Sequence, residues 1–261
     1  MRILVTGGAG YIGSHTVRAL IERGHDPIAF DNLSYGHREA VPADRLVIGD
    51  LNDVPLLERH LAGVDAVIHF AAFAYVGESV TNPAKYYANN LVNSLTLLDA
   101  CRRHGLPRFV FSSTCATYGT PTRVPISEDQ ATADQPVRQH EARLRAGWTT
   151  TPRPFGFCAL QYFNAAGAAG QIHQREPRPQ DAPDPLSVQA AMGRRPRLDI
   201  LLRHGLPTPD GTCIRDYIHV NDLAAAHIWR WKALAGIVGS TTSASAAGSS
   251  VRESDPAPWR R

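Results

Sequence analysis

The chain begins with a short apolar segment that runs directly into glycines spaced three residues apart. Residues 3–6 show no alternation of polar and apolar side chains, which is typical of a strand buried on both faces of a parallel sheet. Gly7, Gly10 and Gly13 follow, and a helix is predicted to begin near Tyr11. A strand, a glycine turn and a helix in this order present unpaired helical amides to an anion. The spacing therefore predicts a parallel α/β fold that binds the pyrophosphate of a dinucleotide.

Acidic residues follow the next two predicted strands. The strand at 27–30 ends in Asp31, about 20 residues after the glycines, where a carboxylate accepts hydrogen bonds from the adenosine ribose. An acid at this point repels the 2′-phosphate of NADP and so favours NAD, although the basic Arg38 is close in sequence. The strand at 45–48 is followed by Asp50, which is either an adenine ligand or a helix cap.

Strand-length apolar segments alternate with helical segments over roughly the first 120 residues. The predicted strands lie at residues 3–6, 27–30, 45–48, 65–70 and 108–112, and a further strand is predicted within 155–164. Such alternation is typical of a doubly wound parallel sheet, the Rossmann α/β architecture. Ligands bind this architecture in the crevice outside the carboxyl ends of the strands.

Small and polar residues follow the fourth and fifth predicted strands, at the edge where ligands bind. Phe70 and Ala71 are candidates to lie beside the cofactor. Ser112, Ser113 and Thr114 either satisfy local backbone groups or take part in chemistry, and their place at a strand end favours chemistry.

A long helix is predicted over residues 82–104. It begins after Asn82, a capping residue, and Pro83, a first-turn proline. Asn89, in its interior, points either to solvent or to the ligand.

Composition excludes several classes of function. The chain has 261 residues, is 43% hydrophobic and carries a formal net charge of +3 that is spread through the sequence, so a nucleic acid is not an expected partner. No segment has the length of a membrane span and no leader precedes the first strand, which predicts a soluble, cytoplasmic protein. The four cysteines lack the spacing of a zinc site or a disulfide framework, so no metal is predicted and the thiols are expected to be free.

Three segments lack the regular pattern of the rest. Residues 131–154 are rich in Arg, Pro and Thr, residues 172–186 are irregular and rich in Pro, and residues 236–261 are predicted to be a disordered tail. The predicted organisation is a dinucleotide-binding domain over 1–165, a smaller and incomplete substrate lobe over 166–235, and the tail.

In its sequence blocks, the chain resembles the UDP-glucose 4-epimerases, a branch of the extended short-chain dehydrogenases/reductases. The resemblance covers residues 1–130 almost continuously and returns at 161–167, 189–200 and 207–228. The blocks that carry it are MRILVTGGAGYIGSH, DNLSYGH, HFAAFAYVGESV, YYANN, SSTCATYG, QYFNAAGA and PTPDGTCIRDYIHVNDL.

The resemblance implies an NAD-dependent isomerase of galactose metabolism that acts on a UDP-hexose. The family reaction passes the hydride of the sugar C4 to NAD and returns it to the opposite face, which interconverts UDP-galactose and UDP-glucose. Thr114 takes the place of the hydroxyl that binds the sugar oxygen, and Asn164 and Arg215 match positions that contact the UDP diphosphate. The implied cofactor-binding residues are Gly7, Gly10, Tyr11, Ile12, Gly13, Asp31, Asn32, Asp50, Leu51, Phe70, Ala71, Ala72, Asn89 and Ser112.

Two features depart from the family pattern. Its catalytic YxxxK pair is absent, because no tyrosine lies between Tyr118 and Tyr162 and no lysine lies between Lys85 and Lys232. Gln161 also replaces the arginine usual in its block.

Two explanations stay open for the missing pair: a homologue that has lost its base, or compensating frameshifts in the coding sequence. The abrupt edges of the three irregular segments favour frameshifts. The alternative function is a non-catalytic NAD-binding or interaction protein on an epimerase fold. A homodimer that pairs through the 82–104 helix is a further expectation.

Overall fold

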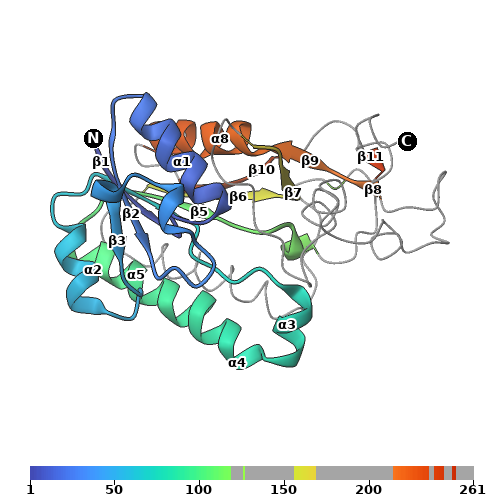
Figure 1. Ribbon diagram of the computed structural model, residues 1–261, viewed down its shortest axis with the longest axis horizontal. Coiled ribbons are helices and arrows are strands. Elements are labelled where there is room, and N and C mark those ends of the chain that lie inside the picture. Colours follow the sequence, from blue (N-terminus) through green and yellow to red (C-terminus); the bar gives the residue numbers. More distant parts are fainter. Residues whose placement is uncertain (119–125, 127–155, 169–213, 235–237, 244–248, 251–261) are drawn as a thin grey trace.

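A seven-stranded parallel sheet forms the centre of the molecule (Figure 1). The computed structural model describes residues 1–118, 126, 156–168, 214–234, 238–243 and 249–250. The strands are β1 (Arg2–Thr6), β2 (Asp26–Asp31), β3 (Leu46–Ile48), β4 (Ala66–His69), β5 (Arg108–Ser112), β6 (Gly156–Tyr162) and β10 (Val238–Ser243). Their order across the sheet is β10-β6-β5-β4-β1-β2-β3. The predicted doubly wound sheet is confirmed, and its first six strands lie close to the predicted ranges.

Helices cover both faces of the sheet (Figure 1). One face packs against α1 (Tyr11–Glu22) and α8 (Val220–Ala233), and the other against α2 (Val54–Leu61) and α5 (Asn93–Arg103). Successive residues of β1 therefore enter different cores, with Leu4 on the α2/α5 side and Ile3 and Val5 on the α1/α8 side. Burial on both faces explains why the strands are continuously apolar in sequence.

The ligand-binding crevice of such a sheet lies where the strand order reverses, here between β1 and β4. The chain builds β1, β2 and β3 toward one edge and then returns to the other side of β1 with β4. Thr6, the last residue of β1, pairs with Phe30 of β2 and His69 of β4. The glycine turn and the exit of β4 therefore meet at one point.

The predicted 82–104 helix is present but changes its winding. It comprises α4 (Pro83–Tyr86), a π-helical segment η3 (Tyr87–Val92) and α5, and it follows the short α3 (Val76–Thr81). The Asn82 side chain caps α4 by accepting a hydrogen bond from the Lys85 amide (3.4 Å). The π-helical turn has no sequence signature and was not predicted, although such turns often occur at functional sites.

Two short ladders lie beyond the main sheet. Strand β7 (Asn164–Ala166) pairs in parallel with β9 (Tyr217–His219), and β8 (Ile214–Arg215) pairs with β11 (Ser249–Ser250). The irregular segments 131–154 and 172–186 lie outside the described residues.

Two short parts of the predicted 236–261 tail form strands. Val238–Ser243 form β10 and Ser249–Ser250 form β11, while the rest of the tail lies outside the described residues. The reason is that β6 offers an unpaired backbone edge, which a Ser- and Thr-rich segment satisfies without apolar side chains. Helix α8 falls within the predicted substrate lobe, yet it packs on the sheet through Ile228 and Trp231.

No helix among the residues that the structure describes is long and apolar enough to cross a membrane.

A buried histidine links the sheet to the long helix. His69 is 2% exposed, and its Nδ1 is 2.6 Å from Thr6 Oγ1 while its Nε2 is 2.7 Å from Ser94 Oγ. Ser94 in turn donates to the backbone oxygen of Asn90 in the π-helical segment (2.7 Å). Buried polar groups are costly unless they are paired, so this chain of bonds fixes α5 relative to β1 and β4.

The substitution His69→Leu removes the partner of two buried hydroxyls while keeping an apolar side chain of similar size. We expect the free energy of unfolding to fall by about 2–4 kcal/mol, measured by urea denaturation. The matched substitution His104→Leu, at an exposed position, should change it by less than about 0.5 kcal/mol. Equal effects would contradict the role given to His69.

Candidate dinucleotide site

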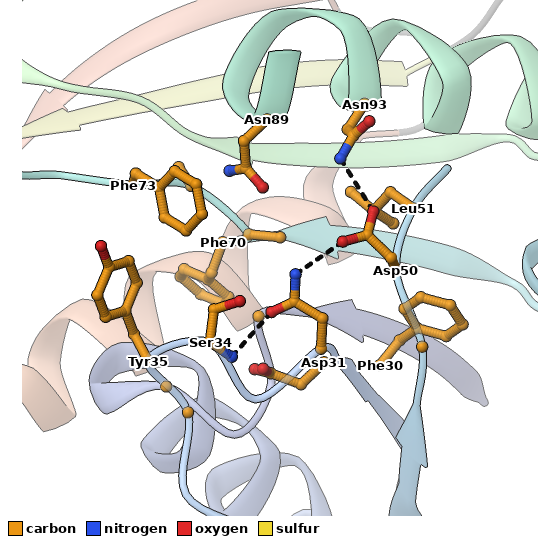
Figure 2. A pocket seen from close by; sticks show the side chains of 17 residues that line it. Phe30, Asp31, Ser34, Tyr35, Asp50, Leu51, Phe70, Phe73, Asn89 and Asn93 are labelled. Carbon is orange, nitrogen blue, oxygen red and sulfur yellow. Dashed lines mark hydrogen bonds between the residues drawn. The ribbon is translucent and has the colours of Figure 1, made fainter. Parts of the chain in front are cut away.

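A pocket opens at the carboxyl ends of β1, β2, β3 and β4 (Figure 2). Its empty space, with the open mouth included, is about 550 Å³. The residues that line it are Gly7, Gly10, Phe30, Asp31, Asn32, Ser34, Tyr35, Gly36, Gly49, Asp50, Leu51, Phe70, Ala71, Ala72, Phe73, Asn89 and Asn93. The structure thus brings together most of the predicted cofactor residues, which are far apart in sequence.

The glycine turn fits a phosphate-binding role. Gly7 has a φ of 67°, and a Cβ there would lie 2.7 Å from the amide nitrogen of Ala71. A Cβ on Gly13 would overlap the carbonyl oxygen of Gly7, so helix α1 can approach the turn only with glycine there. Gly10 caps α1 without a side-chain hydrogen bond and lines the pocket. The first amides of α1 have no intrahelical acceptor, and this positive helix end suits a pyrophosphate.

Asp31 ties the glycine turn to the loop after β2. Its side chain accepts hydrogen bonds from the amides of Ala9 (3.0 Å) and Leu33 (2.8 Å), and the residue is 7% exposed. Burial raises the pKa of Asp31 above its ordinary value, while the backbone amides oppose that shift. The carboxylate lies in the pocket, where it can also accept from ribose hydroxyls. Arg38, the basic residue noted nearby, is exposed.

Asp50 is held by side chains from two elements. Its carboxylate accepts from Asn32 Nδ2 (2.8 Å) and from Asn93 Nδ2 (3.0 Å). The open alternative, a helix cap, is wrong because Asp53 caps α2 by accepting from the Leu56 amide (3.1 Å). Asp50 instead faces the pocket (Figure 2).

The segment after β4 forms another wall of the pocket. Asn90 fixes it by bonding both the amide and the carbonyl of Phe73, each at 2.9 Å. Asn89 donates to Asn90 Oδ1 (2.9 Å) and lines the pocket, so the solvent-facing alternative for Asn89 does not hold. Phe70, Ala71 and Ala72 line the same wall.

An ionic and aromatic cluster supports the wall formed by Tyr35 and Phe73. Glu78 pairs with Lys85 (2.6 Å) and accepts from Tyr86 (2.8 Å). These hydrogen bonds lower the pKa of Glu78, and the bond to Glu78 raises the pKa of Lys85. The Lys85 ammonium lies 4.6 Å from the centre of the Phe73 ring and 3.3 Å from the Tyr35 hydroxyl.

Four predicted residues do not line this pocket. Tyr11, Ile12 and Gly13 form the first turn of α1, where backbone amides rather than side chains would meet phosphate. Ser112 lies at the end of β5, and its hydroxyl is 2.6 Å from that of Tyr162.

The expected substrate side contains two tyrosines that are poorly suited to act as a base. Burial raises the pKa of Tyr162 to about 12, although its bond to Ser112 opposes that rise. Tyr118 is 3% exposed and donates to Gln161 Oε1 (2.8 Å). Gln161, the replacement for a family arginine, thus has a neutral structural partner.

Thr114 precedes a short helical turn, η4 (Cys115–Tyr118), at the same strand end. Burial raises the pKa of the Cys115 thiol, while the hydrogen bond to Thr114 and the charge of Arg215 act in the opposite direction. Thr114 and Arg215, two predicted residues, thus both act on the same thiol. Cys101, Cys115 and Cys158 are free thiols, and the fourth cysteine, Cys213, lies outside the described residues.

Asn164 has a structural role in the described residues. Its backbone amide and its Nδ2 both donate to the carbonyl oxygen of Asp216, each at 3.0 Å. The contact of Asn164 with a diphosphate stays a prediction, for which the second hydrogen of Nδ2 is the suitable donor.

Sequence reasoning missed part of the pocket, notably Asn93, Tyr35 and Phe73. Asn93 carries a usable signal, because it lies four residues after Asn89 on one predicted helix. Tyr35 and Phe73 carry none, since they lie in loops whose approach depends on the whole fold.

Known proteins match both the sequence and the structure. The family described as NAD dependent epimerase/dehydratase matches residues 3–239. A UDP-glucose 4-epimerase of Corynebacterium glutamicum is 48% identical over 234 residues, which are 87% of this chain and 70% of the relative. One of Azospirillum brasilense is 49% identical, over 87% of this chain and 67% of the relative.

Solved structures agree. The UDP-glucose 4-epimerase from Brucella ovis in complex with NAD has a TM-score of 0.87 and 43% identity, and the match covers 97% of this chain and 80% of that one. The UDP-glucose 4-epimerase from Bifidobacterium longum in complex with NAD+ and UDP has a TM-score of 0.85 and 34% identity, over 97% of this chain and 81% of that one. With a family match over most of its length and relatives above 40% identity, the chain belongs to the NAD dependent epimerase/dehydratase family.

Proposed function

We propose that this chain binds NAD at the carboxyl edge of its sheet and serves as a UDP-glucose 4-epimerase, interconverting UDP-galactose and UDP-glucose. The observation that carries the proposal is the Asp31 carboxylate, which lies in the pocket, is buried, and bonds a glycine turn that is too crowded for side chains at Gly7 and Gly13. The names of the relatives support the reaction, and two matched structures hold NAD.

The pocket residues match the parts of the cofactor. The start of α1 would hold the pyrophosphate, Asp31 the adenosine ribose and Asp50 the adenine, and the pocket is lined by Gly10, Asp31 and Asp50. NAD, when bound, supplies the acceptor and then the donor of a hydride. Thr114 would hold the sugar 4-oxygen by a hydrogen bond, and Arg215 would bind the UDP diphosphate through its guanidinium fork.

The absence of the YxxxK pair limits proton transfer in this sequence. In the family the tyrosinate takes the proton of the 4-hydroxyl, and the lysine ammonium favours the ionised tyrosine. Tyr162 bonds Ser112 at the end of β5 and has a raised pKa. Tyr118, in η4 after Thr114, is bonded to Gln161. The missing pair alone is the basis of a second candidate function, a non-catalytic NAD-binding or interaction protein.

An assay of UDP-galactose conversion distinguishes the two functions. We expect the purified chain to retain NAD and to turn over about 10²–10⁴ times more slowly than the Corynebacterium glutamicum enzyme, because a positioned general base contributes a factor of this size. Thr114→Val should lower the remaining rate further, whereas Thr81→Val, at an exposed position, should not. A rate equal to that of the relative would refute the role given to the missing pair. Retained NAD with no turnover would support the second function.

Resequencing the coding DNA tests the frameshift explanation directly. A restored frame that places YxxxK within residues 131–154 would show that the pair was lost to frameshifts. An unchanged read would show that the pair is absent from the gene.

Binding of NAD should depend on the ionisation of Asp31. Because burial raises its pKa, the carboxylate takes up a proton at a higher pH than an ordinary aspartate, and a neutral acid is a weaker acceptor for ribose hydroxyls. We therefore expect NAD affinity, measured by calorimetry from about pH 8 down to about pH 4, to fall before exposed carboxylates titrate.

Asp31→Asn should lower the affinity at neutral pH by about 10–100-fold and remove this pH step. The control Asp44→Asn, at an exposed aspartate that pairs with Arg45, should leave both unchanged. Without ligand, the free energy of unfolding depends on pH in the opposite direction. The folded protein holds the Asp31 proton more tightly than the unfolded chain does, so the contribution of Asp31 to stability falls as the pH rises through its raised pKa. An unchanged pH step in Asp31→Asn would assign the step to another group.

The proposed assembly is a homodimer through the long helix. Tyr87, Val92 and Leu95 on this helix are 44%, 56% and 40% exposed, which is unusual for large apolar side chains in one region. A cytoplasmic location is proposed with it and is supported by the free thiols.

Light scattering should give twice the 28.4 kDa mass of the chain. Val92→Glu should shift the mass to that of one chain, while Val80→Glu, at a 77% exposed residue of α3, should not. A single-chain mass for the unchanged protein would refute the dimer.

A further inference from the structure

The carboxylate of Asp50 is oriented by three donors, which come from two side chains and one backbone amide. Asn32 Nδ2 donates to Oδ2 (2.8 Å), while Asn93 Nδ2 (3.0 Å) and the amide of Asn52 (3.1 Å) donate to Oδ1. Both oxygens are therefore engaged, and the plane of the carboxylate is fixed. An ionised carboxylate has about four lone-pair positions, so the residues that the structure describes leave about one.

The lone-pair position that is left on the Asp50 carboxylate faces the pocket, and an ionised carboxylate can only accept hydrogen bonds. Asp50 and Asn93 face one another across the pocket wall (Figure 2). A ligand group placed there must donate a hydrogen bond, as the 6-amino group of adenine does. A 6-oxo group in the same place would put two acceptors together, which leaves both unpaired.

The two asparagines hold fixed orientations of their own. Asn32 Oδ1 accepts from the amide of Ser34 (3.0 Å), so its Nδ2 must point to Asp50. Asn93 is the first residue of α5, directly after the π-helical segment, and its backbone position is fixed by that helix. If the side-chain amide of Asn32 or Asn93 did not bond Asp50, it could turn either its NH2 group or its oxygen toward a ligand.

We infer that Asn93 is a positioning residue that, together with Asn32, holds Asp50 in the orientation that selects a 6-aminopurine over a 6-oxopurine. The inference rests on the proposed NAD site and adds a determinant of its base specificity. Asn93 acts through Asp50 and is not a catalytic residue.

The test compares NAD with nicotinamide hypoxanthine dinucleotide, which carries a 6-oxo group in place of the 6-amino group. Dissociation constants are measured by calorimetry for the unchanged chain, Asn93→Leu and Asn93→Ala. We expect the unchanged chain to prefer NAD by at least about tenfold. Both variants should reduce that preference by about 3–10-fold through weaker binding of NAD, stronger binding of the 6-oxo analogue, or both.

The control is Thr96→Val on the same helix, whose hydroxyl donates to the carbonyl of Val92 (3.1 Å) and not to the pocket. It should leave the preference unchanged. Circular dichroism establishes that each variant is folded. Because two different substitutions are made at Asn93, the test still works if one of the variants does not fold.

The outcomes separate this inference from the proposed function. If the unchanged chain binds neither dinucleotide, the NAD site itself is refuted, and the inference with it. If NAD binds but both Asn93 variants keep the full preference, or weaken the two dinucleotides equally, Asn93 has only a structural role and the inference alone is overturned.

Discussion

The buried carboxylate of Asp31 is the interaction on which the arrangement of the site depends. It bonds the Ala9 amide in the glycine turn and the Leu33 amide in the loop after β2, so one side chain holds two loops from neighbouring strands. The turn itself rests against the backbone of Phe70 and Ala71 after β4. Three strand ends are thereby fixed around one space before a ligand enters. The cost of this arrangement is a carboxylate removed from water, which explains why its pKa is raised despite its backbone donors.

The sheet and the cofactor residues could be predicted because their signals are local. Apolar strands, the glycine spacing and an acid after the second strand each report a physical requirement of a parallel sheet that binds a phosphate. The π-helical turn, the β10 edge strand and the wall formed by Tyr35 and Phe73 depend on contacts between segments distant in sequence. Asn164 shows a further limit: the resemblance implied a ligand contact, while the described geometry gives its amide to Asp216.

The support of the pocket extends well beyond its lining. The Glu78–Lys85 pair sits behind Tyr35 and Phe73, and His69 links the sheet to Ser94 on the opposite helix. Lys85 of α4 contacts the loops that carry Tyr35 and Phe73, and His69 joins β1 and β4 to α5. A site built in this way is preorganised, because the loops cannot relax without breaking hydrogen bonds within the protein.

The π-helical segment sets the rotational phase of the long helix. A π turn holds about one residue more than an α turn. Residues beyond it therefore take a different rotational position from the one that continuous α-helical winding would give them. Because of this offset, Asn89 lines the pocket while the adjacent Asn90 bonds Phe73 on the same side. Asn93 still reaches Asp50, and Leu97 still enters the core. Regular α-helical winding through the same six residues would turn the residues beyond Val92 by about 100° relative to those before Tyr87. One straight helix could then not bury Leu97 in the core and also present Asn89 and Asn90 to the pocket side.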